Sequence, residues 1–433
     1  MAEIIPLKAW RYHPSLIPDI DQLVSPLFDV VSEKQRKKLY QNPYNSIHLS
    51  VPKGSNPPEN ARLTLKKWKE SGVLVQDRIP SLYVYYQYFQ LPGSSRAYCR
   101  KGFICNIRIY DWDENVIMRH ENTMPVSVND RIDILEKTKL NVSPTHGLYH
   151  DPNFVLEEFM DESMASPLYE TEDYQGVRDV ISVIHDAHVI KTFTNHLKEK
   201  QIILADGHHR YAGSLVYKKK QQAGNPGHTG WEGYNYHMMY LTNMASDDIR
   251  ILPTHRLIHG LKGFDQQEVM KKIEPNFTIK TVENTYDLNE IIVGKKWAFG
   301  ILFKNNAFKI RLKPEVYGDI DWKFPDKIKD LDLTVMHYFV IEKALGIPGK
   351  DHTTSENITF DRSFADCLIK VTTGEAQMAI IVNEITMDKI KDVCFSGFTL
   401  PQKSTYFYPK VICGFLFDSI DDDEFHKNID LSV

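Results

Sequence analysis

A cluster of ionisable side chains interrupts an apolar stretch near the middle of the chain, in IILADGHHRYAGSLV (202–216). Asp206 offers a carboxylate, and His208, His209 and Arg210 follow it closely. Carboxylates are preferred protein ligands of Mg²⁺, and basic side chains stabilise phosphate oxygens. The pattern therefore predicts a phosphate site with a metal at Asp206. The same string also fits a capped turn beside two ordinary histidines, because Asp-Gly is a common turn pair and Asp a good helix N-cap.

A second polar group lies in RHENT (119–123), just before Pro125. Glu121 stands beside His120 in this group. A carboxylate flanked by cationic groups is typical of a general base that acts on an anionic substrate. A solvated strand end would explain the same residues equally well.

Two further sets of polar residues occur in the second half of the chain. Arg256 follows Pro253 in ILPTHR, and Lys403, Ser404 and Thr405 precede an aromatic run. Hydroxyl and ammonium donors in such a group bind phosphate or carboxylate, whereas the alternative for 403–405 is a capped turn before a core strand.

The first cluster must be positioned by a strand and a helix. Ile202–Leu204 reads as a short buried strand, and Ala212, Leu215 and Lys219 then recur at helical spacing. With the turn at Asp206 and the next residue, the two histidines would lie on the first helical turn. Free backbone N–H groups and the helix dipole favour anions at that end of a helix.

Other segments indicate mixed α/β structure in two regions. We expect a strand within 42–52, an antiparallel hairpin over 82–117, a helix that opens at Asp130, and irregular acidic chain over 151–187. A change of composition near 261–267 separates an N-terminal and catalytic region, 1–260, from an α/β C-terminal domain, 261–433, whose segment 400–410 returns to the site.

Composition narrows the classes of protein. The 433 residues carry a formal net charge of −5, so a nucleic-acid or acidic-membrane partner is not expected. The 5 cysteines show no zinc or disulfide spacing, which favours a reducing compartment. The chain lacks a secretory signal and any apolar run of membrane-spanning length. These features predict a cytoplasmic protein with small-molecule substrates, and they leave its oligomeric state open.

The motifs together resemble a known family. The blocks, in order, are PLFDVVS (26–32), NPYNSIHLS (42–50), RHENT (119–123), ADGHHRYA (205–212), ILPTHR (251–256) and LPQKSTYFYPK (400–410). Their order over nearly the whole chain is similar to that of the diphosphate-dependent free-serine kinases, relatives of ADP- and ATP-dependent free-serine kinases. The resemblance implies a ParB/sulfiredoxin-like catalytic core with an additional C-terminal α/β domain. It also implies phosphoryl transfer from inorganic diphosphate to the hydroxyl of L-serine, with Mg²⁺, giving O-phospho-L-serine for serine and cysteine metabolism.

The resemblance also implies roles for individual residues. Glu121, Asp206 and His209 become the catalytic candidates, with Glu121 as the base and Asp206 at the metal. Substrate and diphosphate contacts fall to the remaining matched residues, His120, His208, Arg210, Arg256, Lys403, Ser404 and Thr405. Asn122 stands where the family pattern has lysine, which removes an anion contact but not the base.

Other functions fit the residues as well. An ADP- or ATP-dependent serine kinase would use the same groups, although the sequence has no Walker A loop or protein-kinase signature. A metal-dependent phosphatase or nuclease would use the carboxylate and histidines to activate water. A ParB-like, nucleotide-responsive binding module is the non-enzymatic alternative.

Overall fold

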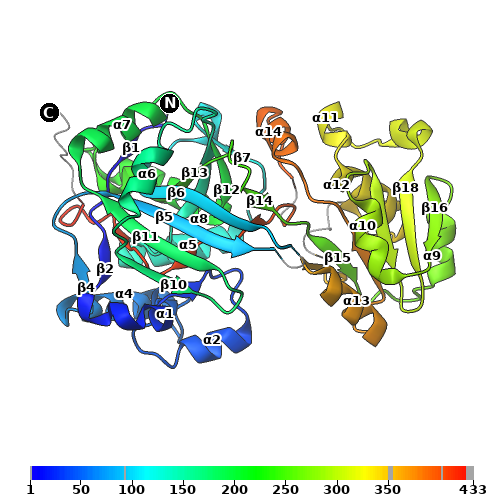
Figure 1. The fold of residues 1–433 in the computed structure, drawn as a ribbon, viewed down its shortest axis with the longest axis horizontal. Coiled ribbons are helices and arrows are strands. Elements are labelled where there is room, and N and C mark those ends of the chain that lie inside the picture. Colours follow the sequence, from blue (N-terminus) through cyan, green and yellow to red (C-terminus); the bar gives the residue numbers. More distant parts are fainter. Residues whose placement is uncertain (1, 92–93, 350–354, 401–402, 426–433) are drawn as a thin grey trace. The chain divides into compact units, whose positions relative to one another are not determined.

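The computed structural model describes residues 2–91, 94–349, 355–400 and 403–425 (Figure 1). The chain forms two compact units. Unit 1 comprises Met1–Arg119, Thr123–Arg250 and Pro409–Val433, and unit 2 comprises His120–Asn122 and Ile251–Tyr408. The division after Arg250 precedes the boundary expected at 260, and the last segment of the chain belongs to unit 1 rather than to a C-terminal domain.

Unit 1 is built on a nine-stranded mixed sheet. Its order is β10-β11-β5-β6-β13-β9-β12-β7, and β1 also pairs with β6. β12 runs parallel to β7 and antiparallel to β9, which makes the sheet mixed. The strands are β1 (Ile4–Ile5), β5 (Leu82–Gln90), β6 (Ala97–Arg108), β7 (Ile117–Arg119), β9 (Thr145–Tyr149), β10 (Tyr169–Glu172), β11 (Arg178–Ile184), β12 (Ile202–Asp206) and β13 (Tyr236–Asn243).

The predicted hairpin forms the centre of this sheet. β5 pairs antiparallel with β6, although Pro92 and Gly93 of the predicted turn lie outside the described residues. Successive β5 side chains point to opposite faces. Val84 therefore joins one hydrophobic cluster, whereas Tyr83 and Tyr85 join another. The sheet is consequently buried on both faces, which explains why the aromatic run is apolar throughout.

Helices cover both faces of the sheet (Figure 1). Phe193 of α7 and Leu215 of α8 pack in the cluster of Val84, and Leu65 and Trp68 of α4 pack in the other cluster. The helices of unit 1 are α1 (Ile20–Leu23), α2 (Glu33–Leu39), α3 (Ile47–Ser50), α4 (Pro57–Glu70), α5 (Pro125–Thr138), α6 (Glu157–Ser163), α7 (Ala187–Leu197) and α8 (His208–Gly224). Its shorter strands are β2 (Trp10–Tyr12), β3 (Ser25–Pro26), β4 (Leu74–Gln76), β8 (Leu140–Asn141), β22 (Ile412–Cys413) and β23 (Asp418–Ser419).

The strand expected within 42–52 is wrong, because this segment contains the short helix α3. Asn45 directs the chain into that helix. Its side-chain oxygen accepts a hydrogen bond from the N–H of Ile47 at 2.9 Å, and its amide donates to the carbonyls of Gln22 and Val24 at 2.7 and 2.9 Å. An asparagine that bonds locally in this way favours a turn or helix start over a strand.

The expected helix start at Asp130 is also wrong. α5 begins at Pro125, whose fixed φ and missing N–H suit the first helical turn. The irregular chain expected over 151–187 instead contains α6, β10 and β11. Asp173 closes the turn between these two strands by accepting from the N–H groups of Gln175 and Val177 at 2.8 and 3.0 Å.

Unit 2 contains a six-stranded antiparallel sheet in the order β16-β18-β17-β20-β15-β19. Phe299 and Ile301 of β17 pack with helices α9 and η6, whereas Ala298 and Leu302 pack with α10 and α13. The strands are β15 (His255–Ile258), β16 (Phe277–Val282), β17 (Ala298–Leu302), β18 (Ala307–Leu312), β19 (Ile358–Asp361) and β20 (Met378–Ile381). The helices are α9 (Gln266–Ile273), α10 (Leu288–Ile292), α11 (Asp326–Lys329), α12 (Asp332–Val335), the π-helix η6 (Met336–Ala344), α13 (Phe364–Thr373) and α14 (Met387–Phe395). Two further strands are β14 (Arg250–Ile251) and β21 (Phe407–Tyr408). The predicted mixed α/β class is confirmed.

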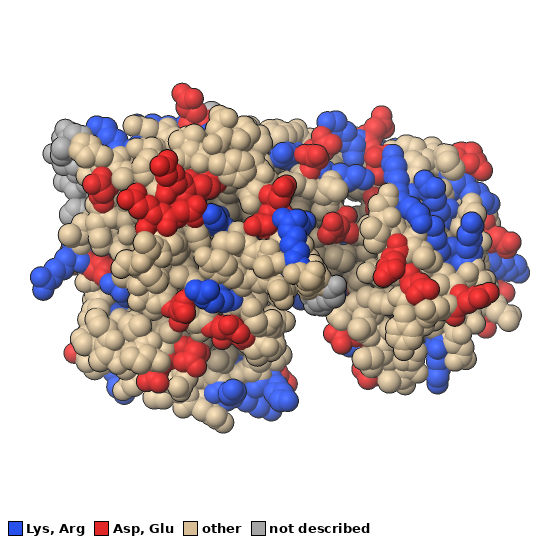
Figure 2. Space-filling model, viewed as in Figure 1, with Lys and Arg blue, Asp and Glu red and all other residues tan. Residues whose placement is uncertain are grey.

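Charge is unevenly spread over unit 2. Figure 2 shows lysine and arginine side chains gathered over β16 and β18. There, burial and the neighbours Lys295, Lys280 and Arg311 lower the pKa of Lys309 to about 8. Neither strand supplies a predicted site residue. Among the described helices, none combines the length and the apolar character that crossing a bilayer requires.

Candidate functional site

The carboxylate of Glu121 is held by a segment of unit 2 that lies 283 residues further along the chain. Its Oε1 accepts hydrogen bonds from the backbone N–H groups of Ser404 and Thr405 at 3.1 and 2.9 Å, and from the Thr405 hydroxyl at 2.9 Å. Bonds from several donors to one charged oxygen are strong and directional. The structure therefore brings together the predicted base and two predicted substrate contacts, and it fixes the carboxylate in one orientation.

The backbone around Glu121 is paired with the same distant segment. The N–H of Leu400 donates to the carbonyl of His120 at 2.7 Å, and the N–H of Asn122 donates to the carbonyl of Leu400 at 3.2 Å. Glu121 and Leu400 thus form a parallel bridge. Residues 401 and 402 of the resembling block lie outside the described residues.

His120 lies behind this arrangement. It is fully buried, its Nε2 is 2.8 Å from the Thr405 hydroxyl, and its ring packs against Phe407 at 6.1 Å. The resemblance implies a substrate contact for His120. In this structure the ring contacts Thr405, so His120 orients a residue that holds Glu121.

Arg256 is a buried cation next to Glu121. It lies on β15 with 1% of its surface exposed, and its Nη1 donates to the carbonyl of Thr254. Burial lowers the pKa of Arg256, the charge of Glu121 raises it in part, and the resulting pKa is about 9. Among the described residues, Nε and Nη2 of Arg256 find no hydrogen-bond acceptor. Because an unsatisfied buried cation is costly, these two donors are suited to an anionic ligand.

Lys403 completes the polar group in unit 2. Its backbone has a positive φ of 58°, a conformation that turns the chain before Ser404 and Thr405. Its ammonium nitrogen lies 5.3 Å from the ring centroid of Phe360, and the guanidinium of Arg256 lies 5.5 Å from the same centroid. Two predicted anion-binding side chains therefore flank one aromatic ring.

The predicted strand, turn and helix around Asp206 are confirmed in unit 1. β12 ends at Asp206, and α8 begins at His208. Gly207 joins them with a φ of 88°, in the left-handed region that glycine adopts readily. A Cβ on Gly207 would lie 2.6 Å from Cγ2 of Thr145 and 2.9 Å from Nη2 of Arg210. The turn therefore requires glycine both for its backbone and for its packing.

Asp206 is bound by two cations. Its Oδ1 accepts from the ammonium of Lys410, and its Oδ2 accepts from Nη2 of Arg210 at 3.1 Å. Burial would raise the pKa of Asp206, but the charges of Lys410 and Arg210 outweigh it and hold the pKa well below its usual range. Arg210 is itself fixed, because its Nη1 donates to the carbonyl of Pro144 at 2.6 Å and the hydroxyl of Ser143 at 2.9 Å.

This arrangement does not fit direct ligation of a metal by Asp206. Both carboxylate oxygens already pair with cations, so a metal ion bound at either one would be repelled by Lys410 and Arg210. Over the described ranges, no group of three or more His, Cys, Asp and Glu side chains has the geometry of a metal site. The Lys410–Asp206–Arg210 triad is instead a fixed array of charge, in which the carboxylate orients two cations.

The two histidines of α8 differ from the expected cationic pair. The backbone N–H of Met124 donates a hydrogen bond to Nε2 of His209 at 3.1 Å. A ring nitrogen can accept such a bond only when it carries no proton. Burial lowers the pKa of His209, in agreement with a neutral ring. His208 is 6% exposed and belongs to the buried side of the helix. Arg210, Lys410 and the helix terminus itself supply positive charge at this end of α8.

The family assignment follows from the sequence. A family described as a protein of unknown function, DUF1015, matches residues 4–334. The chain belongs to the DUF1015 family. The matched range includes Glu121, Asp206–Arg210 and Arg256, and it ends before Lys403. No curated protein matches the chain.

Several solved structures are similar to this chain. A conserved hypothetical protein from Pyrococcus furiosus is 12% identical, with a TM-score of 0.37 over 74% of this chain and 97% of its own. A free serine kinase in complex with AMP is 12% identical, with a TM-score of 0.35 over 72% and 92%. SbnI with a C-terminal truncation, from Staphylococcus aureus, is 10% identical, with a TM-score of 0.36 over 74% and 90%.

Some functional candidates in this DUF1015 chain were missed from the sequence. Lys410 is the last residue of the block 400–410, and its place in that block was the available signal. Arg100 gave no signal, because it lies inside the strand β6. Its Nη2 donates to Gln87 and to the carbonyl of Pro409, and its Nε and Nη1 have no acceptor among the described residues. Burial holds the pKa of His146 well below its usual value, and the positive charges of Arg100 and Lys410 lower this pKa further.

A small cavity lies beneath Arg210 in unit 1. Its volume is about 50 Å³, and Arg131, Ser143, Ser214 and His237 contribute to its lining. Phe28, Leu140, Val142 and Cys413 line it too, so its wall combines polar and apolar side chains.

Proposed function

We propose that the protein transfers a phosphoryl group from inorganic diphosphate to the hydroxyl of free L-serine, giving O-phospho-L-serine and phosphate. The observation that carries the proposal is the clamp on Glu121. The Ser404 and Thr405 donors fix this carboxylate beside the buried guanidinium of Arg256. The blocks that resemble those of the diphosphate-dependent free-serine kinases thus supply a fixed carboxylate, Glu121, and a buried cation, Arg256, whose free donors can bind an anion.

In the proposed reaction, the serine oxygen attacks the terminal phosphorus of diphosphate. The bond from that phosphorus to the bridging oxygen breaks, and inorganic phosphate leaves. Glu121 accepts the proton of the serine hydroxyl, as a general base does. Arg256, through Nε and Nη2, holds an anionic group of the substrate. Phosphoryl transfer needs mainly positioning and charge stabilisation, which these fixed groups are suited to supply.

Asp206, Arg210 and Lys410 serve the diphosphate in this proposal. Arg210 and Lys410 supply positive charge, and Asp206 holds the two cations in place. The first turn of α8 adds backbone N–H groups for phosphate oxygens. Mg²⁺ would arrive bound to diphosphate oxygens, since magnesium commonly binds through phosphates and water with few protein ligands. We place the activity in the cytoplasm, within serine and cysteine metabolism.

A donor screen tests the proposal. The full chain is incubated with L-serine, Mg²⁺ and one of diphosphate, ADP or ATP, and O-phospho-L-serine is measured by mass spectrometry. We expect product with diphosphate. Product with ADP or ATP alone would overturn the donor but keep the acceptor, and absence of product with every donor would overturn the reaction.

Two control incubations separate the remaining alternatives. Release of phosphate from O-phospho-L-serine without a donor, or cleavage of DNA, would indicate a phosphatase or nuclease. Salt-dependent retardation of DNA in a gel would indicate a ParB-like binding module, because contacts to phosphates weaken as salt rises.

A further inference from the structure

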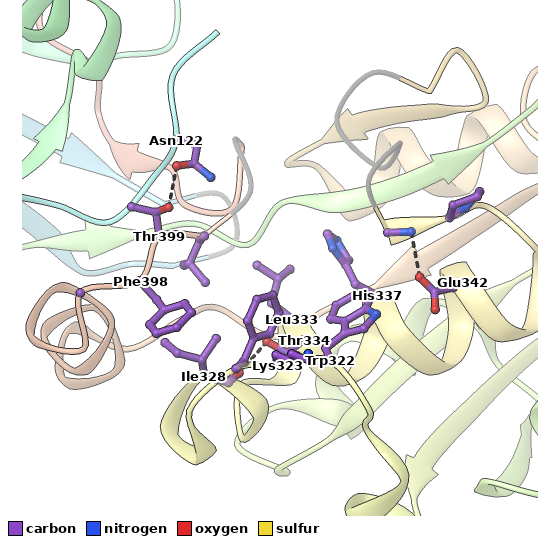
Figure 3. Close-up of a pocket in the computed structure, with 15 residues that line it drawn as sticks. Asn122, Trp322, Lys323, Ile328, Leu333, Thr334, His337, Glu342, Phe398 and Thr399 are labelled. Carbon is purple, nitrogen blue, oxygen red and sulfur yellow. Dashed lines mark hydrogen bonds between the residues drawn. The ribbon is translucent and has the colours of Figure 1, made fainter.

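Unit 2 contains a large pocket that the proposed reaction does not use. Its volume is about 810 Å³, which is within the usual range for small-molecule sites. Figure 3 shows that side chains from two parts of unit 2 face the same space. The lining comes from 322–349 and 397–400, together with Asn122.

The walls of the pocket are largely aromatic. Trp322 and Phe324 meet edge to face at 5.6 Å and 75°, and Phe324 and Phe398 meet at 5.9 Å and 76°. Phe324 and Phe398 are partly exposed, at 37% and 36%. Rings that are exposed at a cavity wall favour a flat apolar ligand, because a further ring can stack or meet them edge-on.

A π-helix supplies polar groups to the same pocket. In η6 the N–H of Leu345 donates to the carbonyl of Val340, five residues earlier, at 3.0 Å. At 3.6 residues per turn, two residues five positions apart would diverge by about 140° around the axis. The wider π turn brings them closer to one face of the helix, and His337 and Glu342, at this spacing, both line the pocket. Short π segments occur frequently at functional sites.

The charges of the lining nearly cancel. Lys323 is its single ammonium group and Glu342 its single carboxylate among the described lining residues. Oε2 of Glu342 is fixed by the N–H of Gly349 at 2.8 Å (Figure 3). A polyanion would find one ammonium group here, whereas a neutral ligand with hydroxyl groups would find a carboxylate, an imidazole, an amide and two threonine hydroxyls. Carboxylates bind ribose hydroxyls in this way in other proteins.

The pocket also shares a wall with the site around Glu121. Asn122 accepts a hydrogen bond from the Thr399 hydroxyl at 2.6 Å, and both residues line the pocket (Figure 3). Asn122 directly follows Glu121, and Leu400, another lining residue, bridges to Glu121. A ligand in the pocket would therefore touch the backbone pair that carries the predicted base.

We infer that this pocket binds a neutral, planar heteroaromatic molecule with hydroxyl groups, of the chemical class of nucleosides, and that the ligand restrains the segment carrying Glu121. The inference does not depend on the proposed phosphoryl transfer. Its contacts lie within unit 2 and can be tested by binding alone.

The binding test uses the full chain and the neutral nucleosides adenosine, guanosine, cytidine and uridine. Isothermal titration calorimetry follows binding up to millimolar nucleoside, so that the readout does not depend on Trp322. We expect saturable binding of at least one purine nucleoside, and an affinity about tenfold weaker in Trp322→Ala and Glu342→Gln. Tyr286→Ala, at an exposed aromatic residue of unit 2 outside the lining, is the matched control and should bind normally.

A second variant guards against misfolding of Trp322→Ala. A Cβ on Gly349 would lie 2.8 Å from the Trp322 ring and 3.0 Å from Oε2 of Glu342, so Gly349→Ala narrows the pocket while it keeps both groups. It should also weaken binding by about tenfold. Absence of saturable binding, or binding unchanged in these variants, would overturn the inference. Tighter binding of AMP or ADP than of the parent nucleoside would overturn the neutral class of ligand.

Hydrogen–deuterium exchange tests the effect on Glu121. We expect the saturating nucleoside to slow exchange in peptides that cover 118–123 and 397–400, as well as around the π-helix. Protection confined to 322–349 would show that the ligand does not restrain Glu121 and would overturn that half of the inference.

Discussion

Both predicted carboxylates of the candidate site are fixed by hydrogen-bond donors. Glu121 is held by three donors, and Asp206 is held between two cations. Such fixed charges cost little reorganisation when substrate charge changes, which is how enzymes lower a barrier electrostatically. A substitution that keeps the size and shape of one of these side chains can therefore test what its charge contributes to the reaction.

Glu121→Gln should remove the base while preserving its clamp, because glutamine keeps an oxygen that accepts from Ser404 and Thr405. We expect the rate of phosphoserine formation to fall by at least about 100-fold, the usual contribution of a positioned base. Initial rates measured by mass spectrometry, with circular dichroism as the check of folding, test this. Glu283→Gln, at an exposed carboxylate of unit 2, is the matched control, and an active Glu121→Gln enzyme would exclude the assigned role.

Lys410→Met should destabilise the protein in a pH-dependent way. Because the folded-state pKa of Asp206 is depressed, its ionisation contributes stability above the unfolded pKa of about 3.9, and that contribution is lost as pH falls through the folded pKa. At neutral pH we expect the free energy of unfolding to fall by about 2 kcal/mol. The loss is smaller than for a buried carboxylate with a single cation, because Arg210 still pairs with Asp206.

Urea unfolding of wild type and Lys410→Met at neutral and acid pH measures this difference. The gap between the two proteins should be largest above about pH 4 and shrink below it. Equal gaps at both pH values would show that Lys410 stabilises the fold by packing and not through the charge of Asp206.

At the level of elements, the turn between β12 and α8 is the most constrained part of the candidate site. Gly207 has a positive φ, and its neighbours Thr145 and Arg210 leave no room for a Cβ. This turn aims Arg210 at Asp206 and sets the start of α8.

Gly207→Ala should therefore lower the free energy of unfolding by about 2 kcal/mol or more, through backbone strain and the contact with Thr145. Displacement of Arg210 should also weaken diphosphate binding, which isothermal titration calorimetry would detect. Gly224→Ala is the matched control at the other end of α8. A Cβ there meets no atom within 4 Å, so alanine should be neutral or stabilise the helix by about 0.5–1 kcal/mol. Equal free energies of unfolding of Gly207→Ala and Gly224→Ala would show that position 207 does not require glycine.

At the scale of the whole molecule, the predicted catalytic residues divide between the units. Glu121 and Arg256 belong to unit 2, and Asp206 and Arg210 belong to unit 1. The block 400–410 contributes to both groups, since Thr405 holds Glu121 and Lys410 pairs with Asp206.

A double-variant comparison tests whether Glu121 and Arg210 act in one reaction. Residues that act together in one reaction give losses that are smaller in combination than the product of the single losses. We expect Glu121→Gln with Arg210→Lys to reduce phosphoserine formation little more than Glu121→Gln alone. Fully multiplicative losses in the initial rate would show that the two residues act independently.

The sequence determined the local chemistry and much of the secondary structure. Apolar periodicity and Asp-Gly predicted the strand, turn and helix around Asp206, and strand propensity predicted the hairpin β5–β6. These signals depend on neighbouring residues alone, so distant contacts in the folded chain did not change the structure that they predict. The short helix α3 and the strands β10 and β11 were missed, because side-chain hydrogen bonds of Asn45 and Asp173 outweighed the weak propensity of their segments.

Only the tertiary structure decided which groups meet. The contact between Glu121 and Thr405 spans 284 residues, and the ion pair of Asp206 with Lys410 spans 204. No periodicity or spacing encodes a pairing of that range, because it depends on how the strands are ordered in the sheets and on where the chain returns. Burial likewise lowers the pKa of His209, and the bond from the Met124 N–H to its Nε2 also favours the neutral ring.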